Sequence, residues 1–124
     1  MVTPSMQLIG EALAEVASVS VDEALALVDG GDAVFVDVRE RAEHDAGAIA
    51  GAVAAPRGFL EFIADPTSPM HNPALSAGKR LVIYCASGGR SALATKTLQD
   101  MGYSDVANLT GGYQAWTGAG GPTE

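Results

Sequence analysis

The sequence of 124 residues contains one cysteine, two histidines and few basic residues. A single cysteine cannot form an intramolecular disulfide, and it excludes a Cys-x-x-Cys redox pair and a cysteine-rich zinc site. His44 and His71 lack metal-ligand spacing, so they are expected in surface or capping roles, and neither a metal nor another cofactor is expected. Seven basic against fifteen acidic residues give a net charge of −8, which disfavours nucleic acid and anionic membranes as partners.

Long apolar runs are also missing. No segment approaches the roughly 20 apolar residues of a transmembrane helix. Glu11 and Glu15 interrupt the first apolar stretch, and no basic region precedes it, which argues against a signal peptide. We therefore expect a cytoplasmic protein, in a reducing setting where a free thiol persists. With 48% apolar and 18% charged residues, the composition predicts a single globular domain over residues 1–124.

Strand and helix patterns alternate along this domain. Strands are predicted at residues 33–38, 52–55, 81–84 and 106–109. Helices are predicted at about residues 5–18, 20–28, 40–45, 90–101 and 113–117, followed by a short tail at 118–124. Ser20 and Glu23 have the spacing of a capping box. Alternation of this kind predicts an α/β fold, with a mostly parallel sheet of about five strands and helices on both faces. The fully apolar strand at 81–84 is expected at its centre.

The cysteine follows this central strand directly. Ligands bind at the carboxyl ends of the strands in open α/β sheets, and Cys85 lies there, just before a helix expected to begin at Arg90. The first N–H groups of a helix have no partner within it, and Gly88 and Gly89 allow the loop to turn these groups toward one point. Such a setting lowers the pKa of a thiol. The alternative is a buried cysteine that only packs in the core. Such a cysteine would not need the Gly-Gly-Arg-Ser sequence that follows at residues 88–91.

Residues 85–91, which read Cys-x-x-Gly-x-Arg-Ser, resemble the active-site loop of the rhodanese sulfurtransferases. Three further stretches resemble that family in the same order: Asp-Val-Arg at 37–39, the segment from Glu43 to Ala52, and the segment from Asn108 to Trp116. One position departs, because Ala48 stands where the family usually has histidine. The resemblance to single-domain rhodaneses implies a rhodanese-like fold and sulfur transfer through a cysteine persulfide.

The resemblance also implies roles for particular residues. Cys85 would be the nucleophile that carries the sulfur. Asp37, Arg39 and Glu43 would brace the loops, with Glu43 as partner of Arg90. Arg90 either binds the anionic donor or holds the loop through Glu43. The expected substrate-binding residues are Ala86, Ser87, Gly88, Gly89, Arg90 and Arg57; the last follows a predicted strand end in a segment that recurs in a subset of single-domain rhodaneses. Tyr113 and Trp116 are expected to pack in the core.

The expected partners are a small anionic sulfur donor such as thiosulfate and a thiophilic acceptor, either cyanide or a thiol, with a protein acceptor as a further option. Two alternatives stay open at this point. One is a sulfur carrier or rhodanese-like binding module that acts on a protein partner. The other is a cysteine phosphatase or an arsenate reductase-like enzyme. Phosphatase loops are one residue longer between cysteine and arginine than the four residues 86–89.

Overall fold

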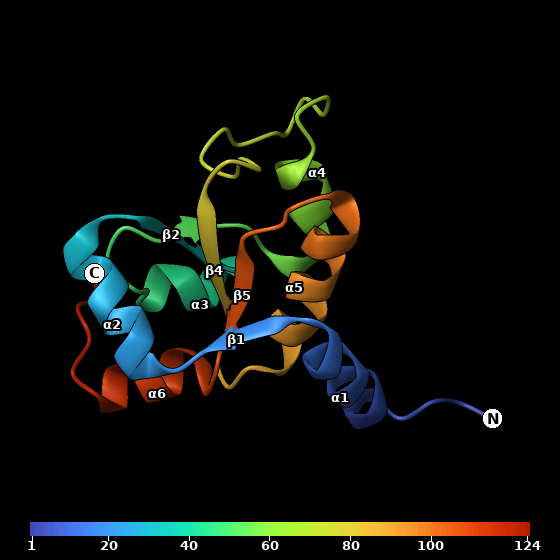
Figure 1. Cartoon of the computed structure of the whole chain (residues 1–124), viewed down its shortest axis with the longest axis horizontal. Helices are drawn as coiled ribbons and strands as arrows, with labels where there is room; N and C mark the ends of the chain where they lie inside the picture. The colour runs from blue at the N-terminus through green and yellow to red at the C-terminus, as the bar shows by residue number, and fades with distance from the viewer.

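A computed structural model describes residues 1–124 and shows five strands flanked by helices (Figure 1). The strands are β1 (Ala17–Val19), β2 (Ala33–Asp37), β3 (Val53–Ala54), β4 (Arg80–Tyr84) and β5 (Val106–Leu109). The helices are α1 (Ser5–Glu15), α2 (Val21–Gly30), α3 (Arg41–Ala46), the 3₁₀ helix η1 (Arg57–Phe59), α4 (Leu60–Ala64), α5 (Gly89–Met101) and α6 (Gly112–Gly118). None of these helices combines the length and the apolar character that a membrane-spanning helix requires.

The sheet has the strand order β1-β5-β4-β2-β3, and every pairing in it is parallel. The predicted α/β class and the central place of β4 are therefore confirmed. Side chains alternate between the two faces of a strand, so Ile83 and Cys85 pack with Leu98 of α5 on one face. Tyr84 packs on the opposite face with Trp116 of α6, which is fully buried as expected.

The N-terminal helix is shorter than predicted. It ends at Glu15, and residues 17–19 form the edge strand β1, which pairs with β5. The prediction of a helix over 5–18 is wrong at its C-terminal end. The strand Ala-Ser-Val there has only three residues and is mostly exposed, so its sequence shows no strand pattern. α1 instead packs along α5, where the Lys96 ammonium lies 3.3 Å from a Glu15 carboxylate oxygen.

The helix ends follow their sequence signals. The Ser20 side chain accepts from the Glu23 N–H, and the Glu23 carboxylate accepts from the Ser20 N–H, so the capping box of α2 is confirmed. The end of the chain, read from sequence only as a tail, is paired with the loop after α3: backbone hydrogen bonds join Ala48 and Glu124 in both directions. The Trp116 indole N–H also donates to the Pro122 carbonyl at 3.0 Å.

Candidate active site

Cys85 lies at the carboxyl end of the central strand, with 1% of its surface exposed. Three donors point at its sulfur. The Gly88 N–H lies 3.1 Å from Sγ, and Ser91 provides its N–H at 3.4 Å and its hydroxyl at 3.3 Å. A sulfur that accepts three hydrogen bonds is arranged to carry negative charge, because donors stabilise the thiolate over the thiol.

The pKa of Cys85 follows from two opposed effects. Burial raises it, but the Ser91 hydroxyl and the backbone N–H groups of Ser91, Gly88 and, least of all, Ser87 lower it by more, and the net shift is downward. The predicted lowering is therefore supported, and its main source among the donors is the Ser91 hydroxyl. Ser87, one of the expected substrate-binding residues, is exposed, and its hydroxyl makes no hydrogen bond to the sulfur.

The loop after Cys85 is held by the start of α6. The Tyr113 N–H donates to the Cys85 carbonyl at 2.8 Å, and the Gln114 N–H donates to the Ala86 carbonyl at 3.0 Å. Gly112 makes this approach possible: it has a φ of +59°, and a Cβ at that position would lie 2.6 Å from the Cys85 carbonyl oxygen. With its carbonyls held in this way, the loop keeps its N–H groups toward the sulfur. Gly88 has a φ of +115°, which turns the loop into α5.

Arg90 is paired with Glu43 as the resemblance implied. Its two terminal nitrogens lie 2.7 and 3.1 Å from the two carboxylate oxygens, the bidentate arrangement of a strong pair. The hydrogen bond from Arg90 lowers the pKa of Glu43, and the same contact raises the pKa of Arg90. The pair joins α3 to the first turn of α5.

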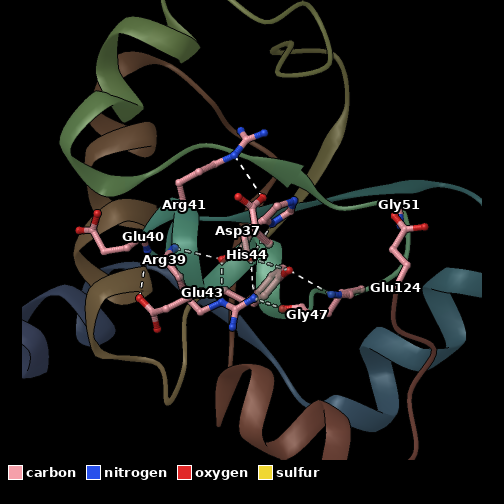
Figure 2. Close-up of polar contacts among 12 residues, drawn as sticks. Asp37, Arg39, Glu40, Arg41, Glu43, His44, Gly47, Gly51 and Glu124 are labelled. Carbon is pink, nitrogen blue, oxygen red and sulfur yellow. Dashed lines mark hydrogen bonds and ion pairs between the residues drawn. The ribbon is translucent and has the colours of Figure 1, made fainter.

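α3 is itself anchored by a buried carboxylate. Asp37 is fully buried, and Arg39 donates to it through Nε and Nη2 at 3.0 and 2.7 Å. His44 Nδ1 and the Tyr84 hydroxyl donate to the same carboxylate at 2.9 and 3.1 Å. Figure 2 shows Asp37, Arg39 and His44 close together, and Arg39 also donates to the Gly47 carbonyl. Burial raises the pKa of Asp37, but the donors from Arg39 and His44 lower it by more.

This cluster corrects the expectation for His44 and supports the bracing roles expected of Asp37 and Arg39. His44 is not a surface histidine, because it contributes to the buried cluster, whereas His71 caps the end of α4 by contacting the Ile63 carbonyl at 2.9 Å. Asp37 and Arg39 lie next to Tyr84, the residue before Cys85, so they are placed to brace the strand end. Burial and the nearby Asp37 charge raise the pKa of Tyr84, which keeps its proton for this hydrogen bond.

Arg57 has other partners. It donates to Glu61 at 3.0 Å and to the Thr97 hydroxyl at 3.2 Å, and no hydrogen bond joins it to residues 85–90. The structure thus brings Glu43 and Arg90 together beside the loop but holds Arg57 against the middle of α5. A contact between Arg57 and the anionic sulfur donor stays a prediction.

Comparison with known proteins agrees with this geometry. The rhodanese-like domain family matches residues 20–119. The chain belongs to the rhodanese-like domain family. A sulfurtransferase of Allochromatium vinosum is 35% identical over 96 residues, which cover 77% of this chain and 82% of that protein. The human thiosulfate:glutathione sulfurtransferase is 33% identical, over 80% of this chain and 91% of its own length.

A solved structure is similar over the full length. It is 42% identical, covers 100% of this chain and 96% of its own, and superposes with a TM-score of 0.93. That protein, from Rhodopseudomonas palustris, is described as a protein of unknown function and a possible tyrosine phosphatase. The rhodanese relatives support sulfur transfer as the activity class of this chain.

Proposed function

We propose that this chain moves a sulfane sulfur from thiosulfate, or a similar anionic donor, to a thiophilic acceptor through a persulfide on Cys85. In the first half-reaction the Cys85 thiolate attacks the outer sulfur of thiosulfate. The S–S bond of the donor breaks, and sulfite leaves with its electron pair. In the second half-reaction an acceptor attacks the outer sulfur of the persulfide, and the electron pair returns to Cys85. Two half-reactions of this kind predict ping-pong kinetics.

The observation that carries the proposal is the convergence of donors on one sulfur. The Gly88 N–H and both donors of Ser91 contact Sγ, and such preorganised donors stabilise charge that develops at the same point during transfer. Residues 86–90 would hold the outer sulfur of the persulfide with their remaining N–H groups. Arg90 would act chiefly by bracing the loop, because both of its terminal nitrogens are occupied by Glu43.

The length of the loop between Cys85 and Arg90 argues against the phosphatase alternative. A phosphoryl group presents three equatorial oxygens, and a cysteine phosphatase surrounds them with the N–H groups of a loop that is one residue longer than this one. Four residues separate Cys85 from Arg90, which leaves room for a single sulfur above the thiolate. A carrier that passes sulfur only to a protein partner would use the same persulfide, and it differs from the proposal in the acceptor alone.

Paired kinetics test the proposal. The purified chain is assayed with thiosulfate and cyanide for thiocyanate, and with an aryl phosphate for phosphate release. We expect thiocyanate formation that Cys85→Ser abolishes, while the circular dichroism and melting temperature of the variant match those of the parent. Cys85-dependent release of phosphate, without thiocyanate formation, would overturn the proposal. A persulfide that forms on Cys85 but does not react with cyanide would identify the carrier alternative instead.

A further inference from the structure

A groove of about 510 Å³ lies beside the active-site loop. Met6, Ile9 and Leu13 of α1 form one wall, residues 87–89 of the loop form another, and Ser18 and Asn108 line it from the neighbouring strands β1 and β5. Figure 1 shows α1 next to the end of α5 at which the loop enters. The volume falls within the range of small-molecule sites. The groove thus shares residues 87–89 with the active-site loop, while its other walls come from residues that the sulfur chemistry does not use.

Asn108 lines this groove and has a buried polar atom without a partner. The residue is 2% exposed, and its Oδ1 makes no hydrogen bond. Nearly all buried polar groups are paired, because an unpaired one costs free energy. The side chain lies against the loop, since a Cβ placed on Gly88 would be 4.0 Å from Asn108 Nδ2. A carboxamide offers an acceptor and a donor together, and a peptide amide is a group that matches both.

The other lining residues define the rest of the ligand. None of them is charged, so the bound portion would be uncharged. Met6 is 73% exposed and Leu13 is 42% exposed, which leaves apolar surface on α1 for an apolar side chain. Ile9 connects this wall to the loop, because its Cδ1 would lie 3.1 Å from a Cβ on Gly89.

We propose that the groove binds the peptide portion of a thiol acceptor: an uncharged, cysteine-containing peptide with an apolar residue beside the cysteine. The inference rests on the proposed sulfur transfer and adds a binding site to it. The acceptor thiolate attacks the outer sulfur of the Cys85 persulfide, the S–S bond breaks with its electron pair returning to Cys85, and the peptide leaves as a persulfide. The amide of Asn108 holds the peptide group during this step.

Three acceptors test the proposal on the full chain: the capped dipeptide acetyl-Cys-Leu-amide, 2-mercaptoethanol, which has no amide, and cyanide, which needs no groove. Ser18→Phe fills the groove from an exposed strand position. Ala17→Phe is the matched control, because the neighbouring side chain is also exposed and points to the other face of the strand. We expect Ser18→Phe to lower the ratio of kcat/KM for the dipeptide to kcat/KM for cyanide by about tenfold, and Ala17→Phe to leave this ratio unchanged.

Asn108→Leu separates a binding role from a structural one. Removing an unpaired buried amide does not cost stability, so we expect the same fall in the ratio with no loss of melting temperature. A ratio within twofold of the parent in both Ser18→Phe and Asn108→Leu would overturn the proposal. If the chain transfers no sulfur to cyanide, the proposed function fails. An NMR titration with acetyl-Ser-Leu-amide then tests separately whether the groove binds a peptide. Chemical-shift changes at Ser18 and Asn108 would support peptide binding, and their absence would overturn it.

Discussion

Replacing Ser91 by alanine is the sharpest probe of how the protein makes Cys85 reactive. The Ser91 hydroxyl lies 3.3 Å from Sγ, on a residue with no exposed surface. A hydrogen bond to a charged group contributes about 1.5–3 kcal/mol, and each pKa unit corresponds to about 1.4 kcal/mol. Ser91→Ala should therefore raise the pKa of Cys85, because roughly this much stabilisation of the thiolate is lost, while the backbone N–H of residue 91 continues to donate to the sulfur.

The assay is the rate of iodoacetamide alkylation as a function of pH, read by intact mass. Since Cys85 is the one cysteine of the chain, the midpoint of the profile reports its pKa alone. Ser87→Ala is the matched control, because that hydroxyl makes no hydrogen bond to the sulfur. An unchanged midpoint in Ser91→Ala, or an equal shift in both variants, would refute the assignment of the Ser91 hydroxyl as the main donor.

Three further predictions concern the surroundings of the loop. Gly112→Ala should destabilise the fold by about 2 kcal/mol or more, measured by urea unfolding, because its Cβ would meet the Cys85 carbonyl at a positive φ; full stability would show that α6 can move away. Arg57→Ala should raise the KM for thiosulfate with little change in kcat, and an unchanged KM would return Arg57 to a purely structural role with Glu61. Because folding lowers the pKa of Asp37, the ionised carboxylate stabilises the fold at pH values above its ordinary pKa of 3.8, and this stability is lost as the pH falls below 3.8. Asp37→Asn should therefore flatten the dependence of melting temperature on pH in that acidic range. A profile as steep as that of the parent would contradict this.

The parts of the fold predictable from sequence are those with strong local signals. The apolar run before Cys85 marked the central strand, because only a strand covered on both faces is apolar throughout. The capping box at Ser20 marked the start of α2 for a similar reason: two reciprocal hydrogen bonds fix one spacing. β1 carried no such signal, since its pairing with β5 depends on residues about 90 positions away in the chain.

The same distinction holds within the site. Cys85 and the turn at Gly88 could be predicted because they are adjacent in sequence and follow a strand. The role of the Ser91 hydroxyl depends on the first turn of α5 placing it over the sulfur, and that of His44 depends on α3 folding back over Asp37. Ser91 stands in the motif Cys-x-x-Gly-x-Arg-Ser, which is the signal that could have identified it. The Ala-for-His departure at position 48 gave no hint that a histidine at 44 would contact the buried carboxylate.

The central claim is that Cys85 carries a sulfur atom between two substrates. It is tested most directly by intact mass spectrometry of the protein after incubation with thiosulfate and removal of the excess. The account predicts a gain of one sulfur atom that maps to Cys85, is absent in Cys85→Ser, and disappears when cyanide is added as thiocyanate forms. A protein whose mass is unchanged by thiosulfate, or whose added sulfur persists in Cys85→Ser, would contradict it.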